Sequence, residues 1–130
     1  MARLCPQVSL HEASGGAGLA LGTAERIRQA VAGLDHLLGV YSMGGANAAI
    51  LSTLANEELE PELFIAHDLD RENRSLLRRG RLAFVLHHDL RADLGQAFQQ
   101  ITAYHKLRPP VSAQGPADVQ IITPANCPRD

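Results

Sequence analysis

Short apolar runs that end in polar residues recur along this chain. Three of them lie in the middle of the sequence, and a segment with helix-like spacing of apolar positions follows each one. They are residues 38–41 before Ser42, 63–66 before His67 and Asp68, and 82–86 before His87, His88 and Asp89. A short apolar run in this context is typical of a buried parallel strand. Because ligands of open α/β sheets bind outside the carboxyl ends of the strands, these polar residues mark a candidate binding site.

Helices are predicted between the strands by apolar residues that recur every three or four positions. The predicted helices cover about residues 23–34, 46–56, 71–79 and 90–106, and two further strands are predicted at 8–10 and 119–123. Thr23 and Asp70 suit the N-caps of the first and third helices, and Gly80 suits the end of the third. Strands and helices therefore alternate along the chain. This alternation predicts an α/β fold with an open, mostly parallel sheet flanked by helices on both faces.

Composition and charge narrow the class of function. The chain has 130 residues, 45% of them hydrophobic, which fits one globular domain with a real core. Its net charge is −2 at pH 7, so it does not resemble the basic surface of a nucleic-acid-binding domain. The basic group Arg74, Arg78, Arg79 and Arg81 is typical of a solvated helix face. No apolar stretch resembles a signal peptide or a membrane helix, so we expect a cytoplasmic protein without membrane contact.

Motifs for nucleotide binding, metal binding and covalent catalysis are incomplete. In the glycine-rich stretch at 15–22, Leu21 stands where G-x-G-x-x-G requires its last glycine. Adjacent His and Asp residues at 67–68 and 87–89 point to opposite faces of a strand, which disfavours a metal site. Ser42 lacks the G-x-S-x-G context of a nucleophile, and the two cysteines follow no metal or redox spacing. We therefore expect no metal, no cofactor and no enzymatic activity.

The residues at the strand ends are better suited to holding hydroxyl groups. The Asp68 carboxylate accepts hydrogen bonds from hydroxyls, and Ser42 and His88 can each donate and accept. Glycines 44 and 45 would let the backbone come close to a ligand, although a tight strand-to-helix turn explains them equally well. The pattern predicts a site that binds a sugar or polyol without catalysing a reaction.

Four separated segments resemble the lactose-repressor (LacI/GalR) family of sugar-responsive transcription regulators. Residues 38–47 resemble the family's Gly-Val-Tyr segment with its glycine-rich turn, and residues 64–68 resemble its strand that ends in a ligand-contacting Asp. Residues 82–89 resemble the strand that reaches the hinge, and residues 119–128 resemble the closing strand. The order and spacing of these segments agree over nearly the whole chain.

The resemblance implies a periplasmic-binding-protein-like (type 1), Rossmann-like fold, with residues 1–130 as the C-terminal effector-binding lobe. It implies ligand contacts from Ser42, Met43, Asp68 and His88, with Ser42 in place of the family's usual Asn and His88 in place of its usual Gln. Asp89 would lie at the hinge, and residues 90–118 would cross to an N-terminal lobe outside this chain. Closure of the two lobes on a sugar or polyol would then control DNA binding by a headpiece that is also outside the chain.

The same resemblance implies a homodimer. Ile50, Leu51 and Leu54 cannot all face one sheet, so some of them are expected at the dimer interface. The apolar stripe of the helix at 90–106 would lack its usual partner. We expect this helix either to fold back onto the sheet or to pair with another chain.

Two alternative functions stay open. One is the sugar-binding protein of a transporter, which shares the fold. The other is a small α/β enzyme that uses Asp68 and His88 as an acid and base pair.

Overall fold

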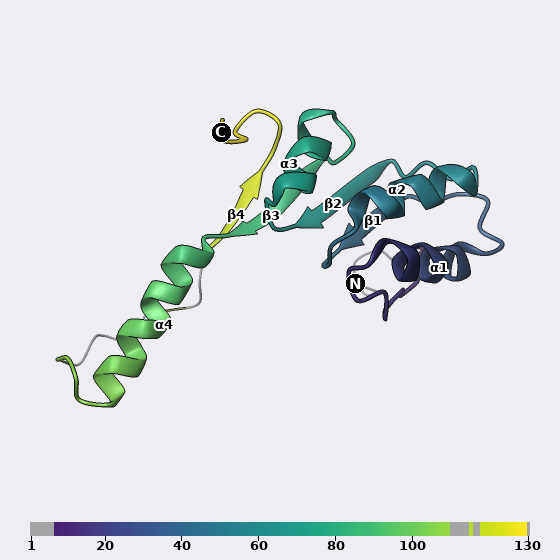
Figure 1. Ribbon diagram of the computed structural model, residues 1–130. Helices are drawn as coiled ribbons and strands as arrows, with labels where there is room; N and C mark the ends of the chain where they lie inside the picture. The colour runs from purple at the N-terminus through teal and green to yellow at the C-terminus, as the bar shows by residue number, and fades with distance from the viewer. Residues whose placement is uncertain (1–6, 110–114, 116–117, 130) are drawn as a thin grey trace.

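The computed structural model describes residues 7–109, 115 and 118–129. Helices and strands alternate along these residues (Figure 1). In chain order they are α1 (Ala20–Val31), β1 (Gly39–Ser42), α2 (Asn47–Asn56), β2 (Leu63–His67), α3 (Arg71–Arg78), β3 (Phe84–His88), α4 (Leu90–Tyr104) and β4 (Val119–Ile122). Each agrees with a predicted element to within about three residues at either end.

The strands form one sheet in the order β1-β2-β3-β4. β1, β2 and β3 run parallel, whereas β4 pairs antiparallel with β3 and places Val119 opposite His88. The expected open, mostly parallel sheet is confirmed. β4 is reversed because α4 leaves from the carboxyl end of β3, and the chain re-enters the sheet at that same end (Figure 1).

One face of the sheet carries the hydrophobic core. Every second strand residue points to this face, and α1, α2 and α3 pack on it. The side chains that are less than 2% exposed are Leu54, Leu77, Leu82, Val85, Asn47 and Asn73. No described helix packs on the opposite face, whereas helices were expected on both faces. That face therefore remains partly exposed.

The amino-terminal part of the chain differs most from the prediction. Residues 8–10 are exposed and form no strand, and α1 begins at Ala20 rather than after Thr23. Thr23 is buried in the helix, where a Cβ added to Gly16 would lie only 2.6 Å from Thr23 Oγ1. The missing side chain of Gly16 thus lets the glycine-rich segment pack against α1, and Thr23 serves this contact instead of capping the helix.

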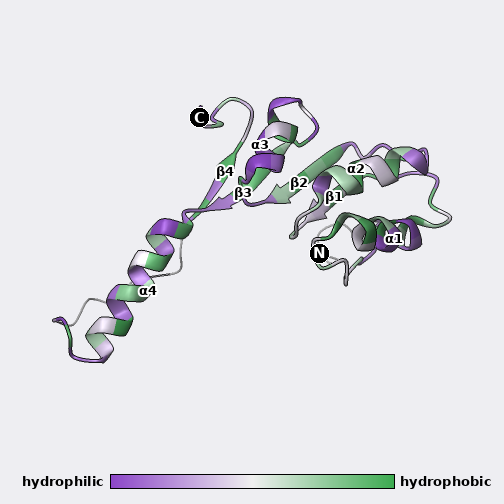
Figure 2. Cartoon of the chain, viewed as in Figure 1, coloured by the Kyte–Doolittle hydropathy of each residue, from purple (hydrophilic) through white to green (hydrophobic). Residues whose placement is uncertain are grey.

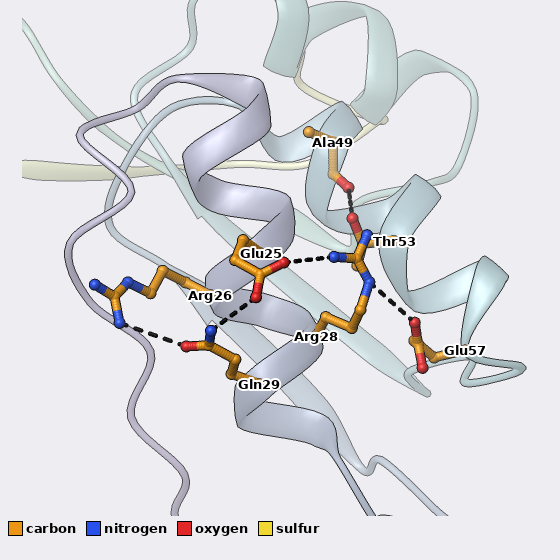
Figure 3. Close-up of polar contacts among 7 residues, drawn as sticks. All are labelled: Glu25, Arg26, Arg28, Gln29, Ala49, Thr53 and Glu57. Carbon is orange, nitrogen blue, oxygen red and sulfur yellow. Dashed lines mark hydrogen bonds and ion pairs between the residues drawn. The ribbon is translucent and has the colours of Figure 1, made fainter.

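α1 and α2 lie side by side, and polar side chains join their outer surfaces (Figure 3). Arg28 of α1 donates to Glu25 at 2.7 Å and forms an ion pair with Glu57, just after α2, at 3.4 Å. All three side chains are well exposed to solvent, so each pair stabilises the fold by less than about 1 kcal/mol. The apolar contacts beneath them hold the two helices together.

Ile50, Leu51 and Leu54 belong to the core, with exposed fractions of 5%, 8% and 1%. α2 packs against both the sheet and α1, so it has two neighbours that cover its apolar positions. The expectation that some of these residues face a dimer partner assumed that α2 packs against the sheet alone. Their burial removes the reason for assigning them to an interface.

α4 projects away from the rest of the described chain (Figure 1), and none of its residues is buried. Only Asp89 separates β3 from α4, and its carboxylate caps the helix by accepting a hydrogen bond from the Ala92 N–H at 3.0 Å. α4 thus continues away from the sheet instead of lying against it. The expectation that this helix folds back onto the sheet is therefore wrong.

The carboxyl-terminal segment is fastened to α3. Arg74 and Arg78 each donate a hydrogen bond to the carbonyl oxygen of Pro128 at 2.9 Å, and Cys127 packs against the core. Two members of the basic group therefore bind backbone rather than only solvent. Cys5 lies outside the described residues. Among the helices that are described, none combines the length and apolarity needed to cross a membrane.

Replacing Leu77 by Ala should destabilise the fold strongly. Leu77 is fully buried between α3 and the sheet, so its truncation should lower the free energy of unfolding by about 3 kcal/mol, measured by urea denaturation. Leu21→Ala on α1 is the matched control, because Leu21 is 89% exposed and its loss should change stability by less than about 0.5 kcal/mol. Equal effects of the two changes would contradict the described core.

Candidate functional site

The carboxyl ends of β1, β2 and β3 lie next to one another at one edge of the sheet. This follows from their parallel pairing, in which Ser42 lies opposite Ala66 and His67 lies opposite Leu86. The residues that follow or end these strands include Met43, Asp68 and His88. The structure thus brings the three sequence-predicted strand ends together along one edge.

Asp68 is an exposed acidic group at this edge. Its backbone adopts a left-handed conformation with φ of 60°, which an Asp tolerates better than most residues. Its N–H donates to the carbonyl oxygen of Leu86 at 2.8 Å, so the backbone is fastened to β3 while the carboxylate faces solvent. A fixed backbone with a free carboxylate is suited to accepting hydrogen bonds from a ligand.

Three rings form a row across the strands on the face opposite to the core. Tyr41 Oη and His67 Nε2 are hydrogen-bonded, with ring centroids 5.4 Å apart. The rings of His67 and His88 are stacked at 6.3 Å and 25°. This row of Tyr41, His67 and His88 adds Tyr41, which was not predicted, and His67, which was predicted at a strand end but not as a ligand contact. Alternation along each strand could have placed the three rings on the face away from the core, but only the register between the strands brings them side by side.

Ser42 and Met43 are placed differently from each other. Ser42 is buried on the core face, and its hydroxyl donates to the carbonyl oxygen of Gly44 at 3.4 Å. This hydroxyl is used inside the turn, a placement that does not favour direct contact with a ligand. Met43 is 75% exposed and extends from the same turn, so it remains accessible at the edge.

A buried pair of amides holds the two loops of the site in place. Asn47 Nδ2, at the start of α2, donates to Asn73 Oδ1 at 2.7 Å. Asn73 Nδ2 donates to the carbonyl oxygens of His67 and Asp68, both at 2.8 Å. The Asn73 N–H donates to the Asp70 carboxylate, which caps α3 as predicted. The turn after β1 and the turn after β2 are therefore linked through one side chain.

His87, near the end of β3, and Asp89, just after it, have structural contacts. His87 Nδ1 accepts a hydrogen bond from the Leu69 N–H at 3.2 Å, and Asp89 caps α4. His87 and His88 lie on opposite faces of β3, and in the part of the chain that the structure describes no three His, Cys, Asp or Glu side chains gather as a metal site. A surface hollow of about 530 Å³ lies elsewhere, beside α3, and is lined by Arg71, Arg74, Arg78 and Arg79.

No protein-family model matches this chain, and no curated protein matches it. Solved structures do resemble it. One is a sugar ABC transporter (sugar-binding protein) from Bacillus halodurans, with a TM-score of 0.56 and 19% identity over 86% of this chain and 42% of that chain. Another is AraP, an arabinose binding protein from Geobacillus stearothermophilus, with a TM-score of 0.63 and 15% identity over 88% of this chain and 42% of that chain.

These likenesses establish the fold. The chain has the α/β fold of periplasmic-binding-protein-like domains, as the resemblance implied. It spans less than half the length of either structure.

Removing the Asn73 amide should loosen the site and weaken the fold. Asn73→Ala removes the side-chain donor to the carbonyl oxygens of His67 and Asp68 and the nearer acceptor of Asn47 Nδ2, so we expect a loss of about 3 kcal/mol in the free energy of unfolding. Asn73→Asp should be at least as harmful, because it places a carboxylate against two carbonyl oxygens. Asn56→Ala, at the exposed end of α2, is the control and should unfold in urea close to wild type.

Proposed function

We propose that this chain is one lobe of a two-lobed receptor for a sugar or polyol, and that the receptor is the effector-sensing part of a LacI-type transcription regulator. One observation carries the ligand proposal. The free carboxylate of Asp68 lies at the same sheet edge as the Tyr41, His67 and His88 rings. Carboxylate and imidazole groups bind paired hydroxyls, and ring faces can lie against the apolar face of a sugar.

Asp68 and His88 would supply hydrogen bonds in this receptor, and Met43 would supply an apolar contact from the turn after β1. Ser42 would shape that turn through its bond to Gly44. Asn73 would position Asp68 without touching the ligand. Because every proposed contact lies at one edge, a second lobe would have to close over it before the ligand is held on both sides.

Lobe closure would give the regulatory signal. In this proposal residues 1–130 are the C-terminal lobe, residues 90–118 cross to the other lobe, and Asp89 is part of the hinge. The placement of Asp89 between β3 and an α4 without buried residues supports this assignment. A ligand that prefers the closed form would shift the receptor between two arrangements and so alter DNA binding by a headpiece outside this chain.

A second candidate is the sugar-binding component of a transporter. The observation in its favour is that one solved structure described above is a sugar ABC transporter's sugar-binding protein and the other is an arabinose binding protein. Ligand binding by this lobe would be the same in either case. The coding sequence upstream of residue 1 separates them, because a helix-turn-helix segment supports the regulator and a secretion signal supports the transporter.

Titration with L-arabinose, other sugars and glycerol tests the ligand proposal. We expect at least one sugar to shift backbone amide NMR signals of Met43, Asp68 and His88, with weak affinity because only one lobe contacts it. Asp68→Asn should weaken that binding about tenfold or more, since it replaces a charged acceptor by a neutral amide.

Asp35→Asn is the matched control, because Asp35 is also exposed but lies before β1, at the opposite edge of the sheet. It should leave the affinity unchanged. Shifts confined to other parts of the molecule, or equal losses in the two variants, would count against the proposed site.

A further inference from the structure

The peptide unit between Asp68 and Leu69 is held at both of its polar groups. Its carbonyl oxygen, which belongs to Asp68, accepts a hydrogen bond from Asn73 Nδ2 at 2.8 Å. Its N–H, which belongs to Leu69, donates to His87 Nδ1 at 3.2 Å. Asn73 comes from α3 and His87 from β3, so two separate elements fix the orientation of one peptide. This peptide directly follows Asp68, the proposed ligand contact.

Asp68 needs this support because of its backbone conformation. Its φ of 60° lies in the left-handed region, which is disfavoured for a residue that carries a Cβ. Hydrogen bonds on both sides of the following peptide hold Asp68 in this conformation and thereby fix the direction of its carboxylate. The bond from Asn73 is insensitive to pH, because a side-chain amide does not gain or lose a proton near neutrality. The bond to His87 differs in this respect, because its acceptor is an imidazole nitrogen.

The contact with Leu69 requires a neutral His87 ring. An N–H can donate to Nδ1 only if Nδ1 carries a lone pair, so the single ring proton of His87 lies on Nε2. A second proton can bind only at Nδ1, where it would point at the Leu69 N–H, and two donors would then face each other. Histidine side chains commonly gain this proton between about pH 8 and pH 5. Acidification therefore breaks the bond to His87 and leaves the bond from Asn73 in place.

The surroundings of His87 leave it as the group that acts directly on the Leu69 N–H. In Figure 2 the apolar part of β3 ends in hydrophilic residues next to α4. His87 lies opposite the uncharged Gln120 of β4, and the residues that α3 buries, Asn73 and Leu77, are also uncharged. Two neighbouring histidines lie on the face of the sheet away from the core, two carboxylates cap α3 and α4, and a third faces solvent. These titratable neighbours, at the ends of β2 and β3 and in the turns that follow, are His67, Asp68, Asp70, His88 and Asp89.

We propose that His87 is a pH-dependent switch for the turn that presents Asp68. With a neutral ring, His87 holds the Leu69 N–H, and the Asp68 carboxylate is fixed at the sheet edge. With a protonated ring, this buried N–H loses its acceptor, the turn loosens, and the edge binds its ligand more weakly. His87 is thus a positioning residue that acts through the backbone. The effect on ligand binding rests on the receptor function proposed above, whereas the effect on the turn does not.

Hydrogen exchange of the free chain, followed by NMR, tests the switch without any ligand. The protection factor of the Leu69 amide should fall roughly three- to tenfold from about pH 8 to pH 5, as expected for the loss of one hydrogen bond. The amide of Ile50, which is bonded to the Ala46 carbonyl oxygen, is the internal reference because it reports any general loss of stability. Protection of Leu69 that follows that of Ile50 at every pH would overturn the proposal.

Two substitutions separate the acceptor from the proton. His87→Asn places an amide oxygen near the position of Nδ1 and does not titrate, so Leu69 should stay protected at every pH. His87→Phe keeps a ring without an acceptor, so Leu69 should be poorly protected even at the alkaline end. His36→Asn is the matched control, because His36 is an exposed histidine before β1, and it should keep the wild-type pH dependence. A transition that persists in His87→Asn belongs to another group and would refute the switch.

Titration with L-arabinose at about pH 8 and pH 5 tests the consequence for binding. The affinity should change with pH more steeply in the wild type than in His87→Asn, by roughly threefold or more. An equal pH dependence of the affinity in the two proteins would overturn the link between the turn and the ligand. A turn that switches as described, in a chain that binds neither L-arabinose nor another sugar at either pH, would contradict the receptor function and leave the switch standing.

Discussion

The buried amide of Asn73 is the constraint on which the arrangement of the strand ends depends. It donates to the carbonyl oxygens of His67 and Asp68 at the end of β2, accepts from Asn47 at the start of α2, and lies in the first turn of α3. Only an amide has two donors and an acceptor in this geometry. Because the backbone around Asp68 is held from the inside, its carboxylate is left free on the outside. The same residue therefore sets the fold of two turns and the exposure of the proposed ligand contact.

Much of the fold could be predicted because it depends on local patterns. Apolar runs located β1, β2 and β3, and Asp70 was correctly identified as the cap of α3. The start of α1 could not be predicted, because it depends on the contact between Gly16 and Thr23, which only the folded chain creates. The direction of β4 could not be predicted from the sequence either, since it depends on where α4 leads the chain rather than on the residues of the strand.

The candidate site shows the same division between local and long-range information. The positions of Asp68 and His88 after or at the end of strands could be read from the sequence, and the structure places them at one edge. The inward orientation of Ser42 could have been derived from the alternation of side chains along β1, because Ser42 shares a face with the buried Phe64 and Ala66. The row of Tyr41, His67 and His88 required the register between strands, which no single stretch of sequence contains.

The antiparallel pairing of β3 with β4 has a consequence for how the molecule can be divided. His88 lies opposite Val119, so the two ends of the segment between them are about one strand spacing apart, roughly 5 Å. Topologically, β3 and β4 are a β-hairpin whose loop has been enlarged to hold α4. A two-residue turn could close that hairpin directly. The core would lose no buried side chain of α4, because α4 contributes none. The sheet with α1–α3 and the projecting helix α4 are thus separable modules. α4 can be exchanged or lengthened without redesigning the core.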